Sequence, residues 1–258
     1  MKSMFSELLK YKRTFTAKLI IFIPVFFAVY SIIINYIIEN NAQAANNASV
    51  ASSWNVFLAL VFNWWSFLFL PLGMGLFAGL VAMQEKRAGN YRAQRSHDIA
   101  PFKIWRNKVF GMAVISFMSS IVLILSIIAS GLLTEKGAMP LKQIITAGLL
   151  CWQVSLVLIP IQLWIATMCG FLLSIGVGFL GTVLGVILAP TSYWIVCPWS
   201  YATRLMCPVI GVHPNGVVLD SPNPLLDTSV IPFGIIVSIL VLALAVCLTG
   251  FWFSRKEL

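Results

Sequence analysis

The feature that most constrains this chain is a run of 47 residues, from Ile144 to Pro190, without a charged side chain. As a single helix, rising about 1.5 Å per residue, the run would be about 70 Å long, more than twice the roughly 30 Å thickness of a bilayer's hydrocarbon core. We therefore predict two membrane-spanning helices within it. The turn between them is expected at Met168 to Leu172, around Gly170, because glycine tolerates the backbone of a tight helix end.

Four further apolar runs are also long enough to cross a membrane. Of the 258 residues, 60% are hydrophobic and 10% are charged, whereas soluble domains carry roughly 25% charged residues. The predicted fold class is all-α: a polytopic membrane helical bundle in one domain, residues 1–258. The expected spans cover approximately 19–38, 56–83, 110–133, 144–168, 172–190 and 231–253, with a cytoplasmic loop over 84–109 and an external loop over 191–230.

The first apolar run has an alternative interpretation as a cleaved signal peptide. The small-residue triplet Ala42-Gln43-Ala44 is typical of a cleavage site. The run is longer than the roughly 7 to 15 residues of a usual signal-peptide core, which favours a retained span.

Basic residues indicate the orientation. With the N-terminus in the cytoplasm, 14 of the 17 Lys and Arg residues lie inside, and only Lys136, Lys142 and Arg204 lie outside. This asymmetry follows the positive-inside rule. Both termini are basic, so an even number of crossings is expected, and the net charge of +9 needs no nucleic acid to explain it.

An amphipathic helix is predicted before the first span. Apolar side chains recur there at helical spacing among polar ones, at Met1, Met4, Phe5 and Leu8. Such a helix would lie along the inner membrane surface. A basic leader without fixed structure is the alternative.

The spans lack the residues that drive several transport and catalytic mechanisms. None of the six contains Asp, Glu, Lys, Arg or His, which disfavours a proton-driven transporter, although sodium sites built from backbone carbonyls stay open. The sequence has no zinc-protease, serine-nucleophile or phosphate-loop motif. We expect no enzyme activity, no metal and no bound cofactor in this chain, with ATP used by a separate ATPase.

The cytoplasmic loop carries the most specific pattern. Its marked residues are Glu85, Gly89, Tyr91, Arg95, Pro101 and Lys108, and residues 90–96 are predicted to form a short helix. On residue types alone, a basic loop that only sets topology explains this segment equally. The pattern resembles the coupling loop of ABC-2-type permeases, in which a Glu and a Gly precede a short helix, a Pro and then a Lys.

Nearly the whole chain resembles one group of that superfamily, the lantibiotic immunity permeases. Supporting features are Trp54-Asn55, Pro198-Trp199-Ser200 and Pro214-Asn215-Gly216. The resemblance implies two permeases, as a homo- or heterodimer, with two copies of a separate ATPase, expelling a cationic antimicrobial peptide across a bacterial cytoplasmic membrane. A non-transporting interaction or assembly protein, or an exporter of another hydrophobic substrate, is the alternative.

The resemblance also assigns roles to residues. The N-terminal helix would be the family's elbow helix, and Glu85 would pair with a basic residue of the ATPase. The expected ATPase-coupling residues are Glu85, Gly89, Asn90, Tyr91, Arg92 and Arg95.

A small-residue face is predicted on the fifth span. Ser174, Gly178, Gly181 and Gly185 fall on one side of a helix, where another backbone can approach closely. Whether that backbone belongs to this chain or to a partner permease stays open.

Few polar or aromatic residues are candidates for a substrate path. We single out Asn63, Trp64 and Trp199, while Gln153 and Gln162 are expected to form interhelical hydrogen bonds. The aromatic start of the external loop is interpreted as an interfacial belt or as a lid over the exit. A disulfide between Cys197 and Cys207 is allowed but not required.

Overall fold

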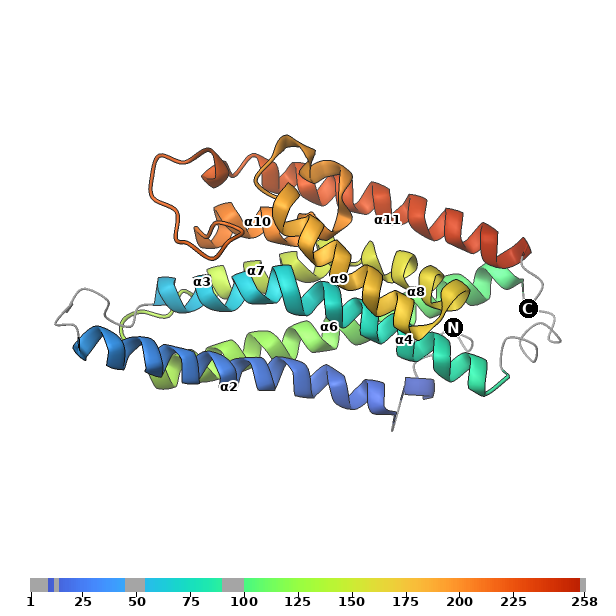
Figure 1. Cartoon of the computed structure of the whole chain (residues 1–258), viewed down its shortest axis with the longest axis horizontal. Helices are drawn as coiled ribbons and strands as arrows, with labels where there is room; N and C mark the ends of the chain where they lie inside the picture. The colour runs from blue at the N-terminus through green and yellow to red at the C-terminus, as the bar shows by residue number, and fades with distance from the viewer. Residues whose placement is uncertain (1–8, 12–13, 45–53, 90–99, 256–258) are drawn as a thin grey trace.

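A computed structural model describes residues 9–11, 14–44, 54–89 and 100–255. The described residues form an elongated bundle of helices, as predicted for an all-α membrane protein (Figure 1). The main helices are α2 (Phe15–Ala44), α3 (Trp54–Trp64), η1 (Trp65–Phe69), α4 (Leu70–Arg87), α6 (Pro101–Thr134), α7 (Leu141–Ser155), α8 (Leu158–Cys169), α9 (Phe171–Leu188) and α11 (Val230–Arg255). The expected N-terminal helix falls mainly on residues 1–8, outside the described residues.

The helices run along the long axis of the bundle. α2 packs against α6, α4 packs against α9 and α8, and α11 packs against α6, α7 and α8. Residues 9–11 and the C-terminal end of α11 lie at the same end of the bundle (Figure 1). This agrees with an even number of passes along the axis.

Four helices of the described part are long and apolar enough to cross a membrane: Trp54–Arg87, Pro101–Thr134, Phe171–Leu188 and Val230–Arg255. The pair α7 and α8 adds a fifth if the two helices are counted as one span, bent by 42°. α2 contributes a shorter apolar stretch, Ile21–Ile34. Six crossings stay a prediction.

Proline and glycine account for the interruptions in these helices. Pro71 has no N–H to donate to the carbonyl of Phe67, and the preceding turns widen into the π-helix η1. The bend between α7 and α8 comes just before Pro160, which likewise has no N–H to donate to the preceding turn. Gly170 joins α8 to α9 with φ +93°, a value that favours glycine, and it is the glycine at which the sequence predicts a turn.

The segment after α9 folds back onto the bundle. It contains η2 (Ser192–Val196), η3 (Pro198–Ser200), α10 (Tyr201–Ile210) and η4 (Pro224–Leu226). α10 packs against α7, α3 and α11 and ends at Gly211, which is left-handed with φ +76°. Cys197 and Cys207 are buried and free, so no disulfide joins them.

One charged residue of this segment is buried. Arg204 of α10 is 6% exposed, and its guanidinium donates to the carbonyl of Leu225, 3.1 Å away. The bond fastens η4 over α10. The sequence placed Arg204 in an external loop, and only the fold shows it to be covered.

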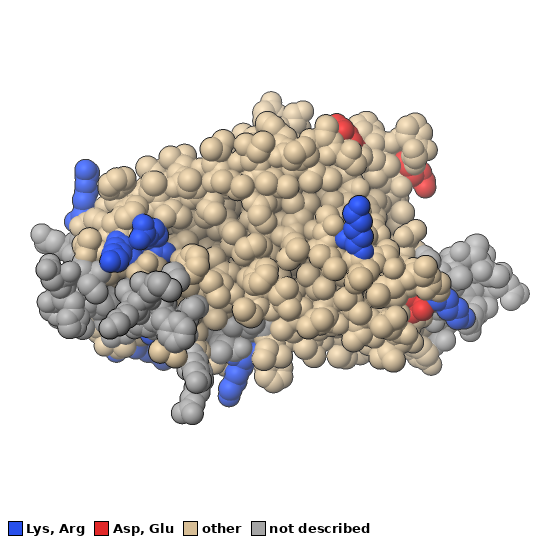
Figure 2. Space-filling view, turned by 180° about the vertical axis from the view of Figure 1, so that it is seen from behind, with Lys and Arg blue, Asp and Glu red and all other residues tan. Residues whose placement is uncertain are grey.

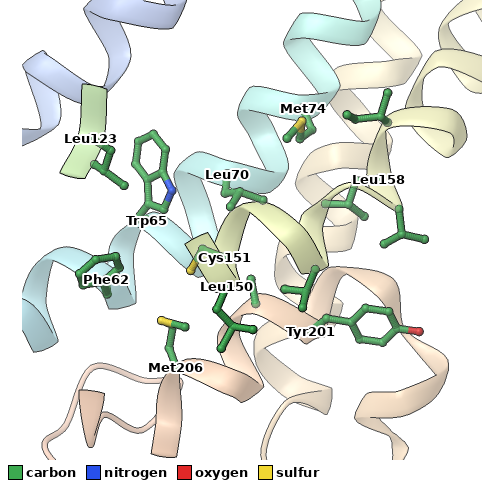
Figure 3. Close-up of a cluster of buried hydrophobic side chains, with 14 of the residues drawn as sticks. Phe62, Trp65, Leu70, Met74, Leu123, Leu150, Cys151, Leu158, Tyr201 and Met206 are labelled. Atoms are coloured by element: carbon green, nitrogen blue, oxygen red, sulfur yellow. The ribbon is translucent and has the colours of Figure 1, made fainter. Parts of the chain in front are cut away.

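The core lies where α10 meets the middle of the bundle. Figure 3 shows side chains converging from α3, η1, α4, α6, α7, α8 and α10, among them Phe62, Trp65, Leu123, Leu150 and Met206. These residues are at most 6% exposed. The returning segment is therefore an integral part of the packed structure.

The small-residue face of α9 is buried against helices of this chain. The Ser174 hydroxyl donates to the carbonyl of Gly75 in α4 at 3.0 Å, and a Cβ added at Gly178 would lie 3.7 Å from the Gly75 Cα. Farther along, Gly181 and Gly185 lie against Trp199 of η3. The open question of which backbone approaches this face is thus answered by α4 and η3.

Interhelical hydrogen bonds engage both glutamines, as expected. Gln153 of α7 donates to the hydroxyl of Ser238 in α11 at 2.9 Å. The side-chain amide of Gln162 in α8 lies 3.1 Å from the hydroxyl of Ser174 in α9.

Replacing Gly181 or Gly185 with Ala should destabilise the protein. A Cβ at Gly185 would lie 2.7 Å from the Trp199 carbonyl oxygen, and one at Gly181 would overlap the Trp199 indole, so each change should cost about 1–3 kcal/mol by overpacking. Thermal unfolding of the purified protein in detergent measures the effect. Gly176 of the same helix is the control, because a Cβ there meets nothing within 4 Å, and Gly176→Ala should not lower the midpoint, since Ala favours a helix over Gly. An equal loss in all three variants would contradict the close approach.

Candidate functional site

A buried ion cluster lies near the end of α4. The Glu85 side chain is 5% exposed, and its Oε1 lies 2.6 Å from the Nζ of Lys108, a residue of α6 that is fully buried. The same oxygen lies 3.0 Å from the Nζ of Lys10, whose side chain is 25% exposed. One carboxylate therefore joins three segments of the chain.

Glu85 differs in one respect from the expectation based on the loop motif. The motif suggested that its carboxylate would meet a basic residue of an ATPase. In the structure, Glu85 is covered and its partners belong to its own chain. The reason is the register of α6, which brings Lys108 to the level of Glu85 on the packed side of both helices.

Burial makes the pair of Glu85 and Lys108 costly to disrupt. Removing water from two charges carries a penalty of several kcal/mol per ion, which the short contact between them must offset. A fully buried ammonium that loses its carboxylate keeps the penalty without the attraction. The contact therefore holds α4 and α6 in register. Removing only one of its two charged side chains would leave the other buried and unpaired, at a large cost in folding free energy.

The N-terminal segment is attached to α4 by two further contacts. The side-chain amide of Gln84 donates to the Lys10 carbonyl at 3.3 Å. The rings of Tyr11 and Phe77 meet edge to face, with centroids 5.9 Å apart, and Tyr11 is 3% exposed. Residues 9–11 therefore pack against α4.

The cluster lies on both sides of the loop between α4 and α6. After Glu85, α4 ends at Arg87 and the chain turns at Gly89, whose φ of +62° favours glycine. The chain is described again from Ala100, and α6 begins at Pro101, where proline is tolerated because a first-turn N–H has no helical partner. The other expected coupling residues, Asn90, Tyr91, Arg92 and Arg95, lie outside the described residues, as does the short helix predicted there.

Charge on the surface is distributed between the ends of the bundle. On the face in Figure 2, Lys and Arg lie mainly towards the end that carries the loop, Asp and Glu lie towards the opposite end together with a smaller number of basic side chains, and the surface between is mostly uncharged. Such a surface suits a membrane-embedded belt.

The three candidates for a substrate path all make packing contacts within this chain. Asn63 is 5% exposed, and its side-chain nitrogen would lie 3.1 Å from a Cβ at Gly216. The Trp64 ring packs against Phe67, with centroids 5.2 Å apart. Trp199 rests on the glycines of α9. Each is engaged in packing, because the returning segment covers this region.

Sequence inspection missed the pairing of Lys10 and Lys108 with Glu85. One signal was available, since Lys108 is the last charged residue before the long apolar run over residues 109–134. Its acidic partner could not be identified without the fold. No group of three or more His, Cys, Asp or Glu suited to a metal occurs among the described residues.

Removing one member of the buried pair should be more damaging than removing both. Glu85→Leu leaves Lys108 charged and covered, and should cost about 3–5 kcal/mol of unfolding free energy. The double variant Glu85→Leu with Lys108→Met should be more stable than Glu85→Leu alone, because no unpaired buried charge remains. A double-mutant cycle in detergent-solubilised protein measures the coupling. Lys103→Met, at an exposed site on α6, is the control and should have little effect, and strictly additive losses would contradict the pairing.

A comparison with protein families gives an independent result. The family model described as ABC-2 family transporter protein matches residues 4–185, a range that includes the ion cluster, the loop and α9. No curated protein matches the chain, and no solved structure does. Members of the matched family are membrane transport components that normally work with an ATPase. The helical architecture and the match over most of its length show that this multi-pass membrane chain belongs to the ABC-2 transporter family.

Proposed function

We propose that the chain is the permease subunit of an ATP-driven exporter that expels cationic antimicrobial peptides of the lantibiotic type and so gives immunity or resistance. Two copies of a separate ATPase would dock on the cytoplasmic loop, and a second permease, identical or not, would complete the transporter. Both termini would lie in the cytoplasm of a bacterial cell.

The observation that carries this proposal is the ion cluster around Glu85. It joins α4, α6 and the N-terminal segment within a few residues of the loop on which an ATPase would act. A force applied to the loop would therefore move these three segments together, as a rigid-body displacement. A loop that served only to set topology would need no such connection.

Charge at the opposite end supports a cationic substrate. Asp220 and Asp227 are exposed there. The pKa of the Asp227 carboxyl is lowered by hydrogen bonds from the hydroxyl and the backbone N–H of Ser229. This carboxylate is therefore charged at neutral pH and would attract a positively charged peptide.

The coupling part of the proposal is tested by co-purification. The chain is expressed with an ATPase encoded beside it, and the tagged ATPase is captured from detergent extracts. Deletion of residues 90–96 should abolish capture, whereas Lys136→Ala, an exposed change near the far end of α6, should not. Unchanged capture after the deletion would place the ATPase contact elsewhere.

The substrate is tested separately by survival of cells exposed to a cationic lantibiotic. Cells that express both subunits should survive higher concentrations than cells that lack the ATPase. Asp220→Asn with Asp227→Asn should reduce that protection, and less so at high salt, because exposed charges are screened. Protection against uncharged hydrophobic compounds alone would favour an exporter of another hydrophobic substrate.

A further inference from the structure

An apolar slot opens between α2 and α4. Its inner chamber has a volume of about 80 Å³ and lies among α2, η1, α4, α6 and α7. An outer groove of about 480 Å³ runs along α2 and α4. The chamber and the groove share Ile23, Phe69, Gly73 and Leu76 in their linings, so they form one space, here termed the α2–α4 slot.

The walls of the slot come from unusual backbone. Trp65 and Phe69 are the first and last residues of the π-helix η1, and both line the chamber. π-helical turns inside α-helices occur frequently at functional sites. Figure 3 shows Trp65 beside Leu123, with Leu70 and Met74 following along α4. Gly73 widens the slot, because a Cβ there would meet nothing within 4 Å.

Three of the four serines that line the chamber already use their hydroxyl protons in hydrogen bonds. The hydroxyls of three lining serines donate to carbonyls of their own helices: Ser116 to Ala113 at 2.8 Å, Ser120 to Ser116 at 3.2 Å and Ser155 to Trp152 at 2.8 Å. None of the residues lining the slot is charged. A phosphate, an ester or a peptide carbonyl would find no donor in these hydroxyls, whereas a hydrocarbon requires none.

We propose that the α2–α4 slot binds a single acyl chain of a bilayer phospholipid, with the methyl end in the chamber and the headgroup outside. The chamber is smaller than the apolar cavities of about 150 Å³ that hold a benzene ring, so it suits the end of a chain. The groove is lined by the exposed side chains of Phe22 and Phe26, which would face lipid. If the slot were empty, the side chains of its walls would lack dispersion contacts on that side. An acyl chain from the adjacent bilayer would supply these contacts.

This inference stands apart from the peptide-export proposal, since it concerns the bilayer and not the cargo. It also gives the slot a structural effect. A chain lying there separates the N-terminal part of α2 from α4, while the contacts of Lys10 with Glu85 and of Tyr11 with Phe77 hold the preceding segment against α4.

Photolabelling tests the proposal. The full chain is placed in nanodiscs of phosphatidylcholine that carries a diazirine at the methyl end of one acyl chain, and adducts are mapped by mass spectrometry after irradiation. Adducts are expected on Trp65 and Met74, which line the chamber and are only 6% and 7% exposed. Adducts confined to Phe22 and Phe26 would show ordinary surface lipid and would overturn the proposal.

Side chains added at Gly73 should block the slot in proportion to their size. Labelling of Trp65 and Met74 should fall in Gly73→Ala and be lost in Gly73→Leu, whereas Gly176→Leu, at an equally open glycine of α9, should leave it intact. If Gly73→Leu does not fold, Ile23→Trp blocks the slot from α2 and should give the same loss. Labelling that persists in a folded, blocked variant would overturn the proposal. So would labelling of these two residues by a diazirine-carrying hydrophobic peptide and not by the lipid.

Discussion

Hydrocarbon offers no hydrogen bond to a peptide group, so each backbone N–H and C=O within the membrane must find its partner inside the protein. The helices of this chain meet that demand along most of their length. The helical hydrogen-bond pattern is interrupted before Pro71 and before Pro160, and neighbouring helices cover both places. The π-helix before Pro71 lies against α9 and α10, and the break before Pro160 lies where α8 packs against α4.

The same constraint limits where charge can be placed. The predicted spans contain no Asp, Glu, Lys, Arg or His, and the structure shows three covered charged residues outside them, Glu85, Lys108 and Arg204. Lys108 is buried with Glu85 as its partner, and Arg204 is buried with the Leu225 carbonyl. The first joins the helices that flank the loop between α4 and α6, and the second fastens the segment that returns onto the bundle after α9. Charge therefore serves to hold segments at the two ends of the bundle, and the middle is left to packing.

Features that depend on local sequence could be predicted, and features that depend on distant contacts could not. The turn at Gly170 and the small-residue face of α9 follow from glycine chemistry and helical spacing. The partners of that face, α4 and η3, are set by how the chain returns on itself. The π-helix before Pro71 could not be predicted in this form, because proline indicates only an interruption and the neighbouring helices decide how it is accommodated.

The candidate site shows the same division. The loop motif identified Glu85, but its assignment to a partner subunit did not allow for Lys108 and Lys10, which approach it from 23 and 75 residues away in the sequence. Trp199 looked like a residue of a substrate path because tryptophan is common at membrane interfaces. The fold instead places it over Gly181 and Gly185, where only glycine leaves room for it.

These contacts meet on one helix. α4 carries Glu85 at its loop end, Gly73 on the wall of the slot and Gly75 against Ser174 of α9. A rigid displacement of α4 would therefore alter the slot and the α9 contact at the same time, because both are formed by residues of α4 and would move with that helix. A lipid chain in the slot would resist that displacement from the side of α2. Its presence would change the work needed to move α4, and the bilayer composition would then affect coupling without any contact between lipid and ATPase.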